Sequence, residues 1–170
     1  MLKKEIRILG LAATDLTCER RLVGIIFRGN LWLDGILTCG FDTHTDYISD
    51  LAQTILKSRQ YSQIRIAISH ESLLPKGMQD LRKLTFKTHI PTISIIPESH
   101  SHSTTTKSRY LRIERGRHKA IVQTSGVNKE VAREIFLVAC RGNSLIPEAL
   151  RIAEMISAAL SRIQSEPSKA

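Results

Sequence analysis

The chain has 170 residues, a length that suits one folded domain with a core that needs no disulfide or metal to hold it. Hydrophobic residues make up 42% of it and charged residues 24%, which excludes a chain that is disordered throughout. The net charge of +9 predicts attraction to polyanions, and to nucleic acid first, because each cation that contacts a phosphate displaces a counterion. The alternative is that this charge only keeps the surface solvated.

The cysteines and the lengths of the apolar runs indicate the cellular compartment of the protein. Cys18, Cys39 and Cys140 form no CxxC pair and show no metal-ligand spacing, which indicates free thiols in a reducing compartment. The first residues turn polar at once, and no apolar run approaches the roughly 18 residues of a membrane span. We therefore expect a cytoplasmic protein without a membrane partner.

The first 41 residues predict an antiparallel meander of three strands. Apolar runs occupy residues 6–11, 22–27 and 31–41, and Arg28-Gly29-Asn30 is a compact polar break that suits a hairpin turn. The middle run is apolar at successive positions, as in a strand that is covered on both faces.

Beyond the meander, helical and extended patterns alternate. Residues 45–58 and 77–87 have apolar side chains at helical spacing, whereas residues 64–69 and 90–96 read as strands. The polar stretch 98–108 predicts a loop.

The last third predicts two short strands and two helices. The strands, at 110–113 and 120–123, flank the basic run 115–119, and helices follow at 128–140 and after Pro147.

Together these elements predict a single α/β domain over residues 1–165 and a disordered tail at 166–170. The sheet is expected to be mixed, an antiparallel meander followed by parallel strands, with helices on its flanks. That is the pattern of a ribonuclease H-like domain.

Several motifs match one archaeal family in their order and spacing. They are the strand and turn 22–29 with Asp34-Gly35, the set Asp80, Leu84 and Pro91, and the C-terminal signatures 122–126 and 147–153.

On these motifs the chain resembles the archaeal domain of unknown function ninety-nine family, uncharacterised proteins that are distantly similar to endonuclease V. The resemblance covers about residues 4 to 163. It implies a ribonuclease H-like fold and a metal-dependent nuclease ancestry.

The resemblance also implies a site in which two or three carboxylates converge on Mg²⁺ or Mn²⁺. The family has an Asp-Asp pair just after the glycine of its first strand, but here Gly10 is followed by Leu11, Ala12 and Ala13. An alanine side chain cannot coordinate a cation, so the main ligand is missing. We therefore predict a depleted metal site with little or no catalysis, and no certain cofactor.

Four other carboxylates are candidate metal ligands. Asp42 and Asp80 match family aspartates and are the catalytic candidates if the chain is active. Asp15 lies close to the lost pair, but it would face away from Ala12 if the first strand continued, and Glu71 is a candidate substitute. The alternative for Asp42 and Asp80 is a loop or helix-cap role.

The segment 107–119 predicts a surface that contacts phosphates, since it holds six Lys and Arg residues against one acid, Glu114. The alternative is a solvated edge strand whose charges deter aggregation. The candidate contacts are Arg28, Lys107, Arg109, Arg112, Arg115, Arg117 and Lys119.

Three functions remain open at this point. The first is a nucleic-acid-interacting protein with a depleted metal site. The second is an active Mg-dependent, endonuclease V-like nuclease, and the third is a non-catalytic partner-binding domain.

Two smaller expectations concern packing. Glu148 and Arg151 stand three apart at a helix start and are expected to pair on one face. Trp32, the single tryptophan, is expected in the core or packed against a hairpin.

Overall fold

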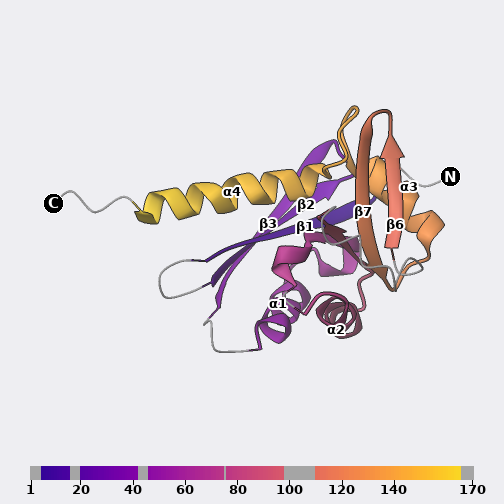
Figure 1. The fold of residues 1–170 in the computed structure, drawn as a ribbon. Coiled ribbons are helices and arrows are strands. Elements are labelled where there is room, and N and C mark those ends of the chain that lie inside the picture. The colour runs from indigo at the N-terminus through magenta and orange to yellow at the C-terminus, as the bar shows by residue number, and fades with distance from the viewer. Residues whose placement is uncertain (1–4, 16–19, 42–45, 75, 98–109, 166–170) are drawn as a thin grey trace.

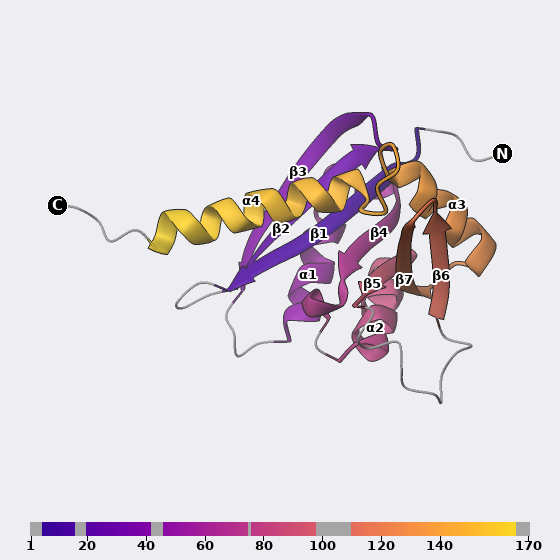
Figure 2. The same cartoon turned by 45° about the horizontal axis from the view of Figure 1, so that its top comes forward.

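A computed structural model describes residues 5–15, 20–41, 46–74, 76–97 and 110–165, leaving out the side chains of Asp15, Gln164 and Ser165. Its centre is a seven-stranded sheet of order β3-β2-β1-β4-β5-β7-β6. Helices lie on both faces of this sheet (Figures 1 and 2).

The sheet joins an antiparallel meander to two parallel strands, as the sequence predicts. β1 pairs with β2 and β2 with β3 in antiparallel fashion, whereas β1, β4 and β5 run parallel. An antiparallel hairpin of β6 and β7 completes the sheet beside β5. The strands are β1 (Arg7–Asp15), β2 (Arg20–Arg28), β3 (Trp32–Phe41), β4 (Ile64–His70), β5 (Thr92–Ile96), β6 (Tyr110–Arg115) and β7 (His118–Ser125).

The helices occupy the predicted segments and lie in pairs on opposite faces of the sheet. α1 and α2 lie on one face, and α3 and α4 on the other (Figures 1 and 2). Asn128 begins α3, where its side-chain oxygen accepts a hydrogen bond of 2.8 Å from the Val131 amide. The helices are α1 (Tyr47–Leu56), α2 (Met78–Thr88), α3 (Lys129–Ala139) and α4 (Glu148–Ser165), with short 3₁₀ turns at Tyr61–Gln63 and Glu71–Leu73.

Strand alternation divides the apolar residues into two cores. Ile8 and Ile25 belong to the core beneath α3 and α4, whereas Leu9 and Ile26 belong to the core beneath α1 and α2. Residues 22–27 of β2 are buried on both faces, which confirms the interpretation of that run. Among the described residues, no helix is both long enough and apolar enough to cross a membrane.

The basic run 115–119 is part of a hairpin rather than a link between two separate strands. Arg115 pairs with His118 across the β6–β7 turn. Gly116, with a φ of 59°, takes the first central position of this two-residue turn, where a type II′ hairpin favours glycine. The exposed cations of this run therefore lie on a regular β-ribbon.

Trp32 does not lie in the core. It is 65% exposed at the start of the edge strand β3, opposite Arg28 of β2. The core alternative of the prediction is therefore wrong, because β3 lies at an edge of the sheet.

The start of α4 lies directly against β1 at Gly10. A Cβ atom at this position would lie 2.2 Å from the carbonyl carbon of Ala149 and 2.3 Å from the amide nitrogen of Leu150. Glycine is required here because two backbones meet without room for a side chain. From this contact α4 runs along β1 towards the end of that strand (Figure 2).

The connection between α3 and α4 is held by side chains from the β2–β3 turn and from β6. Asn30 donates a 2.8 Å hydrogen bond to the Cys140 carbonyl. Arg115 donates to the carbonyls of Leu137 and Gly142, at 2.8 Å and 2.6 Å. These contacts fix the point from which α4 starts.

We predict that Gly10→Ala lowers the free energy of unfolding by about 3 kcal/mol or more, because the added methyl group meets helix backbone that cannot move aside. Urea-induced unfolding followed by circular dichroism measures this. Gly116→Ala is the control, since nothing lies within 4 Å of its Cβ and only the positive φ is strained. If Gly10→Ala lowers the free energy of unfolding no more than Gly116→Ala does, the close contact between Gly10 and the backbone of α4 is contradicted.

Candidate functional site

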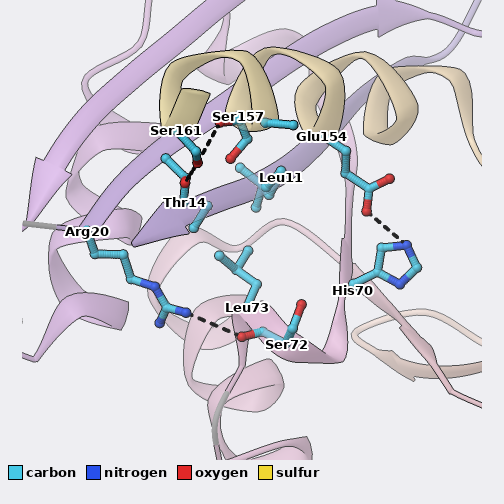
Figure 3. A pocket seen from close by; sticks show the side chains of 12 residues that line it. Leu11, Thr14, Arg20, His70, Ser72, Leu73, Glu154, Ser157 and Ser161 are labelled. Carbon is cyan, nitrogen blue, oxygen red and sulfur yellow. Dashed lines mark hydrogen bonds and ion pairs between the residues drawn. The ribbon is translucent and has the colours of Figure 1, made fainter. Parts of the chain in front are cut away.

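A cavity of about 430 Å³ lies where β1 and β4 end, beneath the second half of α4 (Figure 3). Ligands of open α/β sheets bind beyond the carboxyl ends of the parallel strands, which makes this cavity the candidate functional site. Its walls are formed by Leu11, Ala12, Ala13, Thr14, Arg20, His70, Ser72, Leu73, Glu154, Ser157, Ala158 and Ser161.

Polar contacts join α4 to the ends of both strands. The hydroxyls of Thr14 and Ser161 are hydrogen-bonded to each other, which ties α4 to β1. His70 Nε2 lies 3.0 Å from Glu154 Oε1, which ties α4 to β4 (Figure 3). Ser157 is 95% buried between these two contacts, and its hydroxyl has no hydrogen-bond partner among the described residues.

Sequence reasoning missed this polar side of α4. Glu154, Ser157 and Ser161 are spaced three and four apart, so they form a stripe on one side of the helix. The apolar residues of the same helix predicted its packing, and the polar stripe beside them was the available signal.

Arg20 brings a positive charge to the opposite wall. Its guanidinium carbon lies 5.1 Å from the centre of the Tyr47 ring, within range of a cation–π interaction. Its Nη2 lies 3.5 Å from the Ser72 carbonyl oxygen. The cation is thus held at the cavity by α1 and by the turn after β4 (Figure 3).

Ala12 and Ala13 lie in the cavity wall at the end of β1. These are the positions where the family pattern has its Asp pair, so methyl groups occupy the wall in place of carboxylates. Asp15 ends β1, which shows that the strand runs on past Ala12. Its side chain and the whole of Asp42 lie outside the described residues.

Asp80 and Glu71 do not line this cavity. Asp80 is buried in the first turn of α2, and its Oδ2 accepts a 2.8 Å hydrogen bond from the Lys76 amide, as a helix-cap carboxylate does. It lines a different cavity between α1 and α2. Glu71 directs its Oε1 towards Gly77, 3.8 Å from the place of a Cβ there.

The described residues do not fit the metal site that the resemblance implies. Mg²⁺ and Mn²⁺ require several oxygen ligands, yet among the described lining residues Glu154 alone has a carboxylate, and it faces His70. Nowhere in the described part of the chain do three His, Cys, Asp or Glu residues gather closely enough to share a metal ion.

Three of the basic residues chosen from the sequence lie together on the β6–β7 hairpin. Lys119 lines a second cavity of about 440 Å³ that shares His70 with the first, and Arg117 lies in the adjoining hairpin turn. Arg112 is exposed on β6. These residues belong to the β6–β7 hairpin, and Lys119 reaches the same edge of the sheet as the candidate site.

The other predicted cations are placed elsewhere. Arg28 lies at the opposite end of β1, where its Nη2 is 3.0 Å from Asp34 Oδ1. Arg7 also binds Asp34, and together they lower the pKa of that carboxyl. Arg115 is engaged with the carbonyls that hold the α3–α4 connection. Lys107 and Arg109 lie outside the described residues.

The predicted pairing of Glu148 with Arg151 is confirmed at the first turn of α4. Arg151 Nε donates to Glu148 Oε2 at 3.0 Å and Nη2 donates to Oε1 at 2.6 Å. The Glu148 side chain is 9% exposed, and its bonds to Arg151 lower its pKa despite burial. A carboxylate is also favoured here by the helix dipole. The pair stabilises the start of α4 and does not line the cavity.

Solved structures with the same architecture define the class. A protein of unknown function from Archaeoglobus fulgidus superposes with a TM-score of 0.66 at 20% identity, covering 91% of this chain and 97% of that one. Endonuclease V from Bacillus subtilis superposes with a TM-score of 0.61 at 10% identity, covering 92% of this chain and 80% of that one. The fold is therefore ribonuclease H-like, as predicted.

No protein-family model matches the chain. It is 30% identical over 193 residues to a UPF0215 protein of Methanothermobacter thermautotrophicus, an alignment that covers 98% of this chain and 93% of that protein. The chain belongs to the UPF0215 family. The predicted membership in an archaeal family with the fold of endonuclease V is confirmed.

We predict that Glu148→Gln lowers the free energy of unfolding by about 1 kcal/mol at neutral pH, because it weakens a charge-assisted pair in which Glu148 is buried and Arg151 is partly exposed. The folded-state pKa of Glu148 is lowered from 4.5, so its stabilisation is complete above that value and is lost as the pH falls through the folded pKa. The difference between wild type and variant should therefore shrink in acid. Urea unfolding at a series of pH values measures it.

Glu130→Gln is the control, since Glu130 occupies the first turn of α3 but is exposed. A pH-independent difference for Glu148→Gln, or an equal loss in the control, would show that the Arg151 pair does not stabilise the fold.

Proposed function

We propose that the chain binds nucleic acid at the carboxyl-end edge of its sheet and does not cleave it by a metal-dependent reaction. The main observation in favour of this proposal is that Ala12 and Ala13 form the cavity wall at the end of β1, while Arg20 supplies a cation to the same cavity. Arg20 would attract phosphate, and among the described lining residues Glu154 alone offers a carboxylate, which is too few for a catalytic metal.

The charges along this edge support a polyanionic ligand. Arg20 lines the first cavity, which also holds the Glu154 carboxylate, and Lys119 lines the second cavity, which meets the first at His70. The net charge of +9 adds a long-range attraction that would concentrate a polyanion near the molecule. The two cavities together offer a path for a phosphate backbone rather than a pocket for one small molecule.

The class of ligand is supported by analogy with the fold. An endonuclease shares this architecture, and open α/β sheets bind their ligands beyond the carboxyl ends of the strands even where the function differs. The ligand would lie at the end of β1 and bind without a metal, because the described donors at that position do not suit a metal.

We predict that Lys119→Glu weakens the binding of single- or double-stranded oligonucleotides about tenfold at low salt, and reduces the salt dependence of the affinity. Fluorescence anisotropy over a salt series measures both. Arg65→Glu is the matched control, because Arg65 is also an exposed strand cation but lies at the amino end of β4. Equal weakening by both variants, or no binding by the wild type at low salt, would contradict the proposed surface.

We further predict that the wild-type protein leaves labelled DNA and RNA oligonucleotides intact in Mg²⁺ or Mn²⁺. Denaturing gel electrophoresis over several hours measures cleavage. Metal-dependent cleavage that disappears in Asp42→Ala or Asp80→Ala would contradict the proposal and establish an active nuclease instead.

A further inference from the structure

The two edges of the sheet differ in the features that prevent pairing with another strand. Exposed edges are normally protected by charged residues, proline or bulges. The edge strand β6 carries Arg112, Glu114 and Arg115. The other edge strand, β3, has one charged residue, Asp34, at a bulge, and the bonds from Arg7 and Arg28 already engage its carboxylate. From Gly35 to Phe41, β3 has neither charge nor proline.

The exposed apolar side chains gather at this same edge. In the described part of the chain, nine large hydrophobic residues are exposed, and four of them, each more than half exposed, lie within residues 31–36. Leu33 pairs with Phe27 and Ile36 with Ile25, so both share the sheet face that carries α4. Isolated exposed apolar residues are ordinary, but a cluster on an unprotected edge indicates an interface.

α4 leaves this face of β3 uncovered. It packs on β1 and β2, and its polar stripe, which includes Glu154 and Ser161, faces the cavity between β1 and β4. At 100° per residue, the opposite side of the helix carries Ile152, Ile156 and Ile163, which therefore point towards the β3 side. Ile163 is 70% exposed. We call Leu33, Ile36, Ile152, Ile156 and Ile163 the β3–α4 surface.

We infer that the β3–α4 surface binds a second copy of this chain, through antiparallel pairing of β3 with its counterpart about a two-fold axis perpendicular to the sheet. Such an axis keeps both α4 helices on the same side of the joined sheet. Their apolar flanks then face each other over two strands that neither helix covers alone. A symmetric pairing of this kind uses one surface twice, as most homodimers do.

Charge favours a second copy over other occupants. Each chain carries +9, so contact through most faces would bring like charges together, whereas the β3–α4 surface is uncharged. The five side chains that define this surface carry no charge for a polyanion or an acidic protein to pair with, and Arg21 of β2 lies beyond Ile36 on the same sheet face, opposite Gly40. An identical uncharged surface is its complement.

The area of the surface predicts a dimer of low affinity. β3 has ten residues, and a strip about 30 Å long and about 20 Å wide has an area on the order of 600 Å² per copy. The total of about 1,200 Å² lies at the lower end of specific protein interfaces. The dimer should therefore be visible at micromolar to submillimolar concentrations. This inference is independent of the proposed function.

Sedimentation velocity from about 1 µM to about 200 µM tests this inference over the range expected for an interface of that size. The wild type is expected to approach twice the chain mass of 19.1 kDa, and Ile36→Lys to stay at the single mass. Ile163→Lys, at an exposed position of α4, should weaken the dimer at least tenfold without affecting folding. Phe86→Lys is the matched control, because Phe86 is 78% exposed on α2 and should leave the dimer unchanged.

Circular dichroism and thermal melting show whether each variant is folded. A wild type that remains a monomer throughout this range would overturn the inference. So would a dimer that persists in folded Ile36→Lys and Ile163→Lys, or one that only Phe86→Lys disrupts.

Discussion

The contact between Gly10 and the first turn of α4 determines where the candidate site forms. Because β1 has no side chain at this point, the backbones of Ala149 and Leu150 come within van der Waals reach of the strand. The rest of α4 must then run along β1, and its later turns arrive over the end of that strand. The Thr14–Ser161 and His70–Glu154 contacts close the space between helix and sheet into a cavity.

The position of α4 over β1 has consequences on both sides of the helix. On the flank towards β4, polar side chains meet the strand ends, and the chemistry of the cavity depends on what β1 presents there. In this chain β1 presents the methyl groups of Ala12 and Ala13 to the cavity, and the polar side chains of the described wall, Arg20 and Glu154 among them, come from other elements. On the other flank, α4 stops short of β3, and an uncharged apolar edge is left exposed. The proposed ligand and the proposed dimer thus lie on opposite sides of the same helix.

The order of strands and helices was predictable because hydrophobic periodicity is a local signal. Element ends were less predictable: α1 spans Tyr47–Leu56 within the expected 45–58, and β1 continues beyond Leu11 through small residues that carry no clear strand pattern. Pairing with β2 keeps those residues extended. The loss of the Asp pair was visible in the sequence because it concerns adjacent residues.

The partners of single side chains were not predictable, because they come from distant segments. Nothing near Arg115 in the chain indicates that its guanidinium binds carbonyls of the α3–α4 connection. The pairing of His70 with Glu154 depends on the path of α4, which Gly10 fixes. Trp32 was expected in the core or packed against a hairpin, and only the strand order shows that β3 lies at an edge of the sheet.

The central claim is that this fold binds nucleic acid without a metal ion. The most direct measurement is the equilibrium dissociation constant of a labelled oligonucleotide in EDTA and in Mg²⁺ at matched ionic strength. If phosphates are bound by Arg20, Lys119 and their neighbours, the two constants should agree within about twofold, since cation contacts depend on salt and not on a specific metal. Binding that requires Mg²⁺, or that Mg²⁺ tightens tenfold or more, would mean that carboxylates of this chain hold a metal after all.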